Sequence, residues 1–414
     1  MISEPELNKA NIDEPNIDEP NKVLLSDIKI IKLHDTIGKD EDENIDLDDR
    51  IYDNSYFSYE EETEEKKSDE KLVMGQTGLL NLGNMCFMNS TIQIIRNTKI
   101  LNLFLDNTNQ YESFIKKDLP ETIIFNEWND LRKLMNSQSI TISPKRFVYF
   151  MQQVARVKKL ELFTGFVQND LSEFLLFIVE SLHSSISRSI EFNISGNKEN
   201  PLDELAINCY QMLKNIYRKE YSEIMDMFYG VLISEILSID ASIIHNTKSE
   251  QYFILDLELP EKNIQGEKLT IYDCFDEFTC SEILDGENAW FNEKTGKRED
   301  IQKRIRFWSF PKVLIITLKR FSSDGIHKIN QFIDFPIEGL DLTKYICGYT
   351  PSQYVYDLYG VCCHYGSVNG GHYTAIVKTN NEWYHYNDQH IQKISLAEIV
   401  TPHAYCLFYQ KRNI

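Results

Sequence analysis

The order of secondary-structure patterns along the chain limits its fold most strongly. Apolar residues recur with helical spacing in the first half, at 89–105, 123–135, 144–154, 166–183 and 203–228. Beyond about residue 229 the pattern changes to β-rich or alternating runs, at 231–239, 251–259, 305–308, 313–321, 354–363, 372–378, 383–386 and 404–409. Helices that precede strands predict an α+β fold.

The N-terminal segment 1–71 differs in composition from the rest. It holds 23 acidic against 9 basic side chains, so it carries −14 of the net charge of −21. The tandem Asn-Ile-Asp-Glu-Pro at 11–20 is of low complexity. We expect a mostly disordered acidic arm. An apolar stretch at 23–33 is either a short docking strand or a partner-binding motif, and both interpretations stay open.

The bulk composition excludes several classes of protein. A hydrophobic fraction of 42% over 414 residues suits a globular enzyme. The chain has no run of about 18 apolar residues and no secretory signal at its start, so we expect no membrane association. A net charge of −21 argues against nucleic acid as a partner. The eight cysteines form no CxxC pair, which favours a reducing intracellular compartment, the cytoplasm or nucleus, of a host cell if the source is viral. No dimer signal is visible, and we expect a monomer.

The segment 78–90 places a cysteine, Cys86, after a Gly-Asn turn and before a helical pattern. A thiol at a helix start faces unpaired N–H groups and the positive end of the helix dipole. Both favour the thiolate, which is the nucleophilic form. Far downstream the chain supplies His372 after two glycines, and then Asn387 and Asp388. These residue types are the parts of a thiol-hydrolase triad.

Each part alone also has a structural interpretation. A cysteine in an apolar setting is usually a small core residue. A Gly-Gly pair before a histidine is often a hairpin turn. The combination favours catalysis, because a packing cysteine does not require the other parts.

These residues resemble the ubiquitin-specific protease family, a papain-like class of deubiquitinating enzyme, over about residues 76–410. Seven separated motifs follow the family's order, at 78–93, 168–183, 228–230, 255–260, 311–336, 359–373 and 383–409. The resemblance implies a catalytic domain over 72–412. Within it, a helical thumb would cover about 76–225, β fingers about 229–308 and a β-rich palm about 309–410.

The resemblance also implies a mechanism. Cys86 would attack the carbonyl carbon of ubiquitin's last glycine, and His372 would take and return the proton. Asn387 would orient the imidazole, with Asp388 as a possible helper, and which of the two dominates stays open. Asn81 would donate its side-chain amide to the oxyanion, together with the Cys86 backbone N–H.

The implied partners are ubiquitin and ubiquitinated proteins. Gln168, Asp170 and Glu173 would bind the basic tail of ubiquitin, because acidic groups suit its arginines. His364 and Tyr373 would line a slot too narrow for a Cβ. For Asp170 and Glu173 the alternative is helix capping and a solvated helix face.

The chain departs from the family in its fingers. Many members hold a zinc ion there with two CxxC pairs, and four thiolates make such a closed site. The corresponding positions are Ser238, Ala241, Asn292 and Thr295, which cannot replace those ligands. We therefore expect no metal and no other cofactor, and fingers held by strand pairing and apolar packing.

Two further departures flank the nucleophile. Met85 stands where the family usually has Thr, and Phe87 where it usually has Tyr. They motivate one alternative, a catalytically weak ubiquitin-binding scaffold. A second alternative is a protease for another ubiquitin-like modifier.

Overall fold

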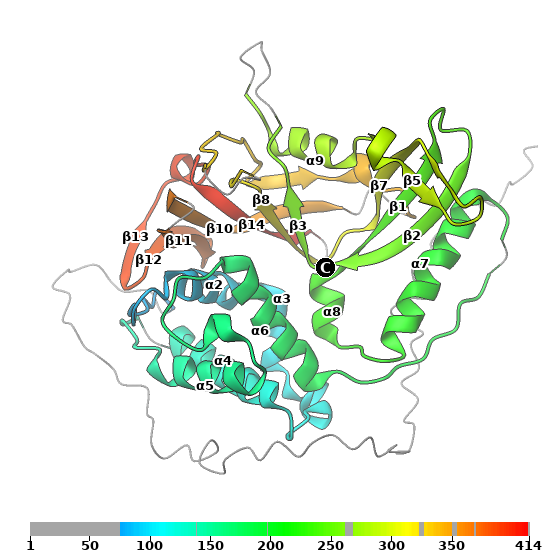
Figure 1. Cartoon of the computed structure of the whole chain (residues 1–414). Helices are drawn as coiled ribbons and strands as arrows, with labels where there is room; N and C mark the ends of the chain where they lie inside the picture. The colour runs from blue at the N-terminus through cyan, green and yellow to red at the C-terminus, as the bar shows by residue number, and fades with distance from the viewer. Residues whose placement is uncertain are drawn as a thin grey trace, which may run out of the picture.

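The computed structural model describes residues 75–137, 139–196, 198–260, 268–322, 327–349, 354–367 and 370–412. Most of the helices gather on one side of the molecule and the β-sheets on the other (Figure 1). The acidic arm predicted for 1–71, with its apolar stretch, lies outside the described residues.

The first half of the chain is helical, as predicted, but two of the predicted helices are each divided into two. Thr98 has an extended backbone and its hydroxyl pairs with that of Tyr359 at 2.8 Å, which ends the first helix within 89–105. Tyr221 exchanges two backbone hydrogen bonds with Arg188, which interrupts 203–228. The helices are α2 (Cys86–Arg96), α3 (Lys99–Asp106), α4 (Pro120–Ser137), α5 (Lys145–Val157), α6 (Leu171–Ile186), α7 (Pro201–Tyr217) and α8 (Glu223–Phe228).

Helix α6 begins later than the apolar pattern from 166 predicts. Asp170 has an extended backbone, and its side chain accepts a hydrogen bond from Ser172 N at 2.7 Å. Such a cap fixes the helix start, because it satisfies a free N–H of the first turn. Residues 166–170 therefore approach the helix as a loop.

The larger sheet has eight strands in the order β13-β12-β11-β10-β14-β8-β3, and β9 pairs with β10. Its neighbours are antiparallel except for β3 and β8. Figure 1 shows α2 on one side of this sheet, among the other helices, and α9 (Ile271–Thr279) on the other. The strands are β3 (Ile254–Leu257), β8 (Val313–Leu318), β9 (Glu338–Asp341), β10 (Val355–Ser367), β11 (Gly370–Thr379), β12 (Glu382–Asn387), β13 (His390–Lys393) and β14 (Ala404–Lys411).

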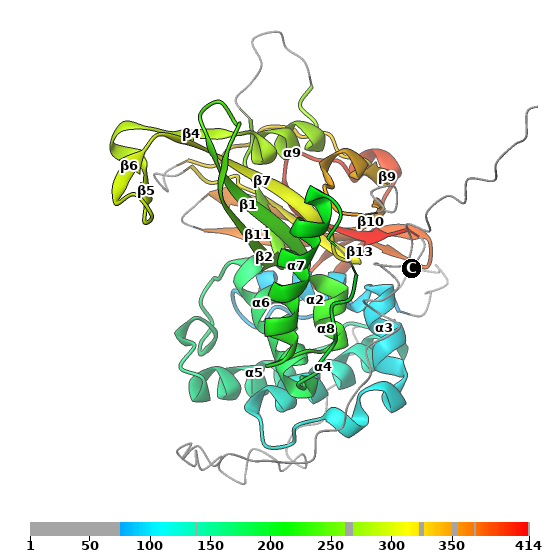
Figure 2. The same cartoon turned by 90° about the vertical axis from the view of Figure 1, so that its right-hand side faces the viewer.

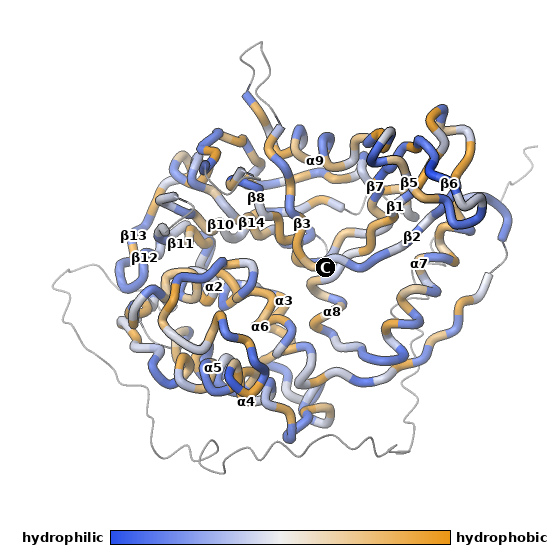
Figure 3. Tube along the Cα trace, viewed as in Figure 1, coloured by the Kyte–Doolittle hydropathy of each residue, from blue (hydrophilic) through white to orange (hydrophobic). Residues whose placement is uncertain are grey.

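The core lies where the helices meet this sheet. Helix α2 packs against β10, β11 and β12, and every residue of α2 is buried. All six residues of β8 are buried as well, which agrees with its continuous apolar sequence. Figure 3 shows hydrophobic residues along β3 and through the helices around α6.

A second sheet has the strand order β2-β1-β7-β4, and β5 and β6 form a separate ribbon. Figure 2 shows that ribbon at the end of the molecule far from the helices α4 and α5. The run 251–259 was predicted as one strand, and this is wrong. The chain changes sheets at the buried Phe253, between β2 and β3. The strands are β1 (Gly230–Ser238), β2 (Ile244–Tyr252), β4 (Glu282–Leu284), β5 (Trp290–Asn292), β6 (Lys297–Glu299) and β7 (Ile301–Ser309).

A buried ion pair holds the second sheet in addition to the predicted strand pairing and apolar packing. Glu235 of β1 is fully buried. Its two carboxylate oxygens lie 2.6 Å from the Nη2 atoms of Arg304 and Arg306 on the neighbouring strand β7. A buried carboxylate needs such partners, because desolvation of an unpaired charge is costly.

Candidate active site

The cysteine segment forms a tight turn that leads directly into helix α2. Gly83 and Asn84 both have positive φ angles, of 118° and 52°. Oδ1 of Asn81 accepts the backbone N–H groups of Gly83 and Met85, each at 3.0 Å, and so closes the turn. Cys86 is the first residue of α2 and is 4% exposed. The thiol therefore lies at the helix N-terminus, as the sequence predicts.

His372 reaches the same place from strand β11. Asn387, at the end of the adjacent strand β12, places Oδ1 2.7 Å from Nε2 of His372. The pKa of His372 is raised from 6.5 to about 9, first by a hydrogen bond with Cys86 and then by the Asn387 bond and the nearby negative charge of Asp388, against a lowering by burial. Since Asn387 occupies Nε2, proton exchange with Cys86 falls to Nδ1. The fold thus brings the predicted cysteine, histidine and asparagine together.

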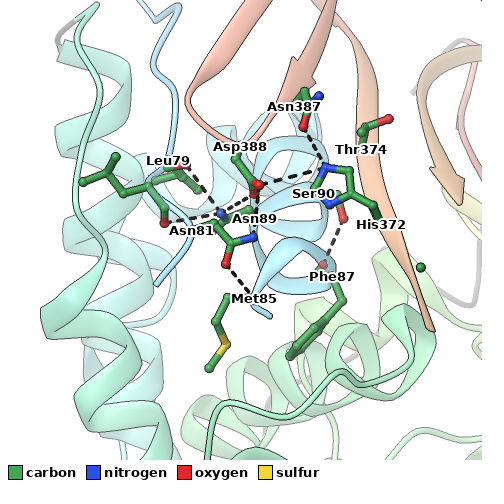
Figure 4. Close-up of polar contacts among 12 residues, drawn as sticks. Leu79, Asn81, Met85, Phe87, Asn89, Ser90, His372, Thr374, Asn387 and Asp388 are labelled. Atoms are coloured by element: carbon green, nitrogen blue, oxygen red, sulfur yellow. Dashed lines mark hydrogen bonds and ion pairs between the residues drawn. The ribbon is translucent and has the colours of Figure 1, made fainter. Parts of the chain in front are cut away.

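Asp388 lies beside this group and is held by several partners (Figure 4). Its Oδ2 atom is 4.0 Å from His372 Nε2 and accepts a hydrogen bond from Asn81 Nδ2 at 3.1 Å. Its Oδ1 atom accepts one from Asn89 Nδ2 at 2.7 Å. Asn387 is therefore the direct partner of the imidazole, and Asp388 adds a charge at longer range.

Asn81 combines two structural contacts with its predicted role. Its oxygen closes the turn before Cys86, and one of its amide N–H groups bonds Asp388. A primary amide carries two N–H donors. The second donor is what the predicted oxyanion contact requires.

A cavity opens beside Cys86, between the helices and the sheet. Four of the five predicted tail-binding residues line it: Gln168, Asp170, His364 and Tyr373. The fifth, Glu173, is exposed in the first turn of α6 and is not among the lining residues. The other lining residues are Cys86, Phe87, Asn169, Phe321, Ser367, Gly370 and Gly371.

Asp170 is both a helix cap and part of a hydrogen-bonded cluster in this cavity. Oδ1 caps α6, as the alternative interpretation held. Oδ2 accepts hydrogen bonds from the hydroxyls of Tyr405, at 2.7 Å, and Tyr373, at 3.3 Å. Burial first, and then the charge of Asp170, raise the pKa of both tyrosines, so both remain hydroxyl donors. Tyr405 was not predicted as a site residue, although it lies within the closing motif.

Gln168 spans the cavity and contacts the strand that carries His372. Its Nε2 donates to the carbonyl oxygen of Gly371 at 3.2 Å, and its Oε1 lies 3.4 Å from the Gly371 nitrogen. A Cβ at Gly371 would lie 2.2 Å from Nε2 of His364 and 2.4 Å from the carbonyl oxygen of Tyr365. This position therefore requires glycine.

His364 forms the floor next to that glycine. It is 4% exposed, and burial first, then the charge of Lys328, lower its pKa to about 4. The ring is thus neutral at physiological pH. Its face packs against Tyr373, with ring centroids 4.7 Å apart.

Comparison with known proteins identifies the family. The family model described as ubiquitin carboxyl-terminal hydrolase matches residues 77–409. The chain belongs to this family. The resemblance seen in the sequence motifs is thereby confirmed over nearly the whole predicted catalytic domain.

Curated members of the hydrolase family are similar over the same region. Ubiquitin carboxyl-terminal hydrolase 2 of Homo sapiens is 32% identical over 348 residues, which are 82% of this chain and 56% of that protein. The Gallus gallus protein of the same name is 32% identical over 82% of this chain and 94% of its own length. Ubiquitin carboxyl-terminal hydrolase 21 of Homo sapiens is 30% identical over 82% of this chain and 62% of that protein. The chain thus spans just over half the length of the two human relatives.

Solved structures share the fold. The yeast SAGA DUBm matches with a TM-score of 0.61 at 24% identity, over 84% of this chain and 70% of that one. The SAGA Ubp8/Sgf11/Sus1/Sgf73 DUB module bound to ubiquitin aldehyde matches with a TM-score of 0.62 at 23% identity, over 84% and 71% of the two chains. The α+β, ubiquitin-specific protease fold predicted from the sequence is confirmed.

Hydrogen-bonded turns lie at the positions where many family members hold zinc. Ser238 lies in a turn closed by Asp240, which also accepts a hydrogen bond from Ser242 N at 3.1 Å. Asn292 and Thr295 both donate to Glu299, at 3.0 and 2.6 Å. In the described part of the chain, no group of three or more His, Cys, Asp or Glu side chains could hold a metal ion. The residues present do not fit the four-thiolate zinc site.

The helices of the described ranges give no support for a membrane span. None of them is both long enough and apolar enough to cross a bilayer.

Proposed function

We propose that this protein is a thiol-dependent deubiquitinase that hydrolyses the peptide or isopeptide bond after the C-terminal glycine of ubiquitin. The observation that carries the proposal is the convergence of Cys86, His372 and Asn387 beside a narrow cavity. Membership of the ubiquitin carboxyl-terminal hydrolase family supports both the chemistry and the substrate.

The proposed reaction begins with a thiolate–imidazolium pair. The raised pKa of His372 keeps the imidazole protonated at neutral pH, next to the Cys86 sulfur. The sulfur bonds to the glycine carbonyl carbon, and the carbonyl electrons move onto oxygen. Asn81 and the backbone N–H of Cys86 then stabilise the oxyanion, each donor contributing about 3 kcal/mol.

Two proton transfers complete the cycle. The tetrahedral intermediate collapses and expels the substrate amine, which takes the proton from His372 and leaves a thioester on Cys86. His372 then takes a proton from water as the water oxygen attacks the thioester carbon. The second intermediate releases the Cys86 thiolate and the C-terminal carboxylic acid of ubiquitin, which becomes the carboxylate by losing its proton to solvent. Asn387 holds the imidazole in one orientation through both transfers.

The cavity suits an extended glycine-containing tail. Gly370 and Gly371 form one wall, and His364 fills the space behind Gly371. Asp170 and Gln168 offer oxygen and amide groups to the basic tail of ubiquitin. In this proposal the thumb covers about residues 76–225, the fingers about 229–308 and the palm about 309–410. The protein would be a monomer of a reducing compartment.

A scaffold function without catalysis is less well supported. Met85 and Phe87, which motivated it, are both 1% exposed. Phe87 packs edge-on against Phe174, with ring centroids 5.6 Å apart. These residues therefore act as core packing, and neither removes a group that the reaction needs.

The test is turnover of fluorogenic reporters made from ubiquitin and, separately, from another ubiquitin-like modifier. We expect release from the ubiquitin reporter by the native chain and no release by Cys86→Ala. Cys280→Ala is the matched control, because Cys280 is an exposed cysteine at the end of α9. Faster turnover of the other modifier would overturn the assignment of ubiquitin as the substrate. Tight ubiquitin binding without turnover would favour the scaffold function.

A further inference from the structure

We propose that Asn89 is a positioning residue for the reaction, because its carboxamide fixes the Asp388 carboxylate beside His372. This inference rests on the proposed hydrolase function. It adds a residue that contacts neither the imidazole nor the proposed substrate path.

Asn89 lies on α2, one helical turn after the nucleophile, and is 2% exposed. Its Nδ2 atom donates to Asp388 Oδ1 at 2.7 Å. The same nitrogen lies 3.5 and 3.4 Å from the carbonyl oxygens of Leu79 and Leu80. The contact with Asp388 is the shortest of the three, and hydrogen bonds to an ionised acceptor are the stronger kind.

Asp388 is consequently fixed on both of its carboxylate oxygens. Asn89 holds Oδ1, and Asn81 holds Oδ2 at 3.1 Å. The Asp388 backbone carbonyl accepts the N–H of Leu79 at 3.1 Å. Figure 4 shows the two asparagines on one side of this carboxylate and His372 on the other. The arrangement directs Oδ2 toward His372 Nε2, at 4.0 Å.

The backbone of Asp388 adopts an uncommon conformation. Its φ angle is +50°, in the left-handed region that non-glycine residues rarely adopt. The residue follows directly after Asn387, at the end of β12. Without Asn89, the side chain loses the donor that ties it to the nucleophile helix, and the carboxylate keeps the 3.1 Å bond of Oδ2 with Asn81 but loses the shorter bond at Oδ1.

The other end of the Asn89 side chain indicates the same role. Its Oδ1 atom is buried, and no partner for it exists among the described residues. A buried carbonyl without a partner is energetically unfavourable, because it has lost its hydrogen bonds to water. Asn89 therefore keeps a buried carboxamide at an energetic cost. The hydrogen bonds of this carboxamide are all made by its Nδ2 end, which faces Asp388.

The consequence is a link between the helix of Cys86 and the strand of Asn387. Loss of Asn89 misplaces a negative charge near His372 and removes the fixed partner of Asn81. We therefore expect Asn89→Ala to lower kcat by about 10- to 100-fold with little change in KM. The basic limb of the kcat/KM profile should move to lower pH, because the charge of Asp388 helps to keep His372 protonated.

A double-mutant cycle on the full chain with the ubiquitin reporter tests this role. The variants are Asn89→Ala, Asp388→Ala and the pair, with Asn97→Ala as control for a carboxamide lost from the other end of α2. We expect the pair to be no slower than Asp388→Ala alone, since both changes remove one interaction. Asn97→Ala should keep the native kcat and pH profile.

Several outcomes would overturn the inference. Multiplicative losses in the pair would show that Asn89 acts independently of Asp388. A folded Asn89→Ala with native kcat and pH profile would show that Asn89 positions nothing. If Asn89→Ala does not fold, Asn89→Asp, which retains size but faces Asp388 with a second carboxylate, should be folded and slow, and native kcat in it would equally contradict the inference. If the native chain itself has no turnover, the proposed function fails, and this inference with it.

Discussion

Nε2 of His372 and Oδ1 of Asn387 lie 2.7 Å apart on two neighbouring antiparallel strands, β11 and β12. A rigid sheet thus holds the imidazole, while the nucleophile comes from the N-terminus of a helix packed on that sheet. The account predicts that Asn387→Ala lowers kcat about 100-fold or more at little changed KM, because the imidazole loses its orienting group. Steady-state kinetics on the ubiquitin reporter measure this.

The choice between the two candidate orienting residues can be tested by comparison. We expect Asp388→Asn to be milder than Asn387→Ala, since Asp388 lies 4.0 Å from the imidazole and its replacement keeps a side-chain oxygen. A larger loss in Asp388→Asn would assign the dominant role to the carboxylate.

His372 should titrate far from its ordinary range. A hydrogen bond with Cys86 is the largest cause that raises its pKa to about 9. NMR titration of the imidazole should show this value in the native chain and a lower one in Cys86→Ala. An unchanged pKa of His372 in Cys86→Ala would show that the Cys86 thiol does not interact with the imidazole.

The same shift has a consequence for stability. The folded protein binds the His372 proton more tightly than the unfolded chain does. This stabilisation is complete below about pH 6.5 and is lost as the pH rises through about 9. Chemical denaturation of the native chain and of His372→Ala across this pH range isolates the contribution of His372 to the free energy of unfolding. Equal pH dependence in both proteins would exclude a contribution from His372.

Gly371→Ala should abolish turnover of the ubiquitin reporter. The added Cβ would lie 2.2 Å from His364 Nε2 and 2.4 Å from a carbonyl oxygen, so β11 must shift next to His372. Displacement of a catalytic group by about 1 Å costs roughly 100-fold in rate. Gly165→Ala is the matched control, because no atom lies within 4 Å of its added Cβ. Native activity in Gly371→Ala would contradict this account of the slot.

The ion pairs of the buried Glu235 should stabilise the second sheet. Glu235→Ala leaves the partly exposed Arg304 and Arg306 without their shared partner, and we expect the free energy of unfolding to fall by about 1–3 kcal/mol. Glu250→Ala removes an exposed ion pair with Lys248 on β2 and should change the free energy of unfolding by less than about 1 kcal/mol. Urea denaturation measures the free energy of unfolding of both variants. Similar losses in the two variants would mean that burial of Glu235 has no special effect.

Activity should not depend on zinc. Ser238 and Asn292 belong to hydrogen-bonded turns at positions where thiolates would be needed. Prolonged treatment with a strong chelator should leave reporter turnover and Tm unchanged. A loss that added zinc restores would reveal a metal site elsewhere.

Contiguous motifs made the members of the candidate site predictable. Cys86, His372 and Asn387 each lie within a distinctive run of residues, and a nucleophile, a base and an orienting group form a recognisable set. Tyr405 and Asn89 also lie within such runs, but their roles depend on contacts with Asp170 and Asp388 that only the folded chain creates. A polar side chain on the buried face of a predicted helix was the available signal for Asn89.

The fold was predictable in class but not in its divisions. Periodicity identified the helices and most long strands. It could not show that the chain changes sheets at Phe253, because residues 252–255 form one uninterrupted apolar run across the change. The short strands β4, β5 and β6 carry too few residues for a pattern. Glu235 shares a strand face with the buried Ile233 and Leu237, so the alternation indicates that its charge is buried. The sequence does not show that its partners lie on β7.

Reaction with ubiquitin that carries an electrophile at its C-terminus tests the central claim most directly. The account predicts a single covalent adduct on the native chain, which peptide mass spectrometry places on the Cys86 sulfur, and none on Cys86→Ala. An adduct on another cysteine, or none at all in a folded chain that binds ubiquitin, would contradict it.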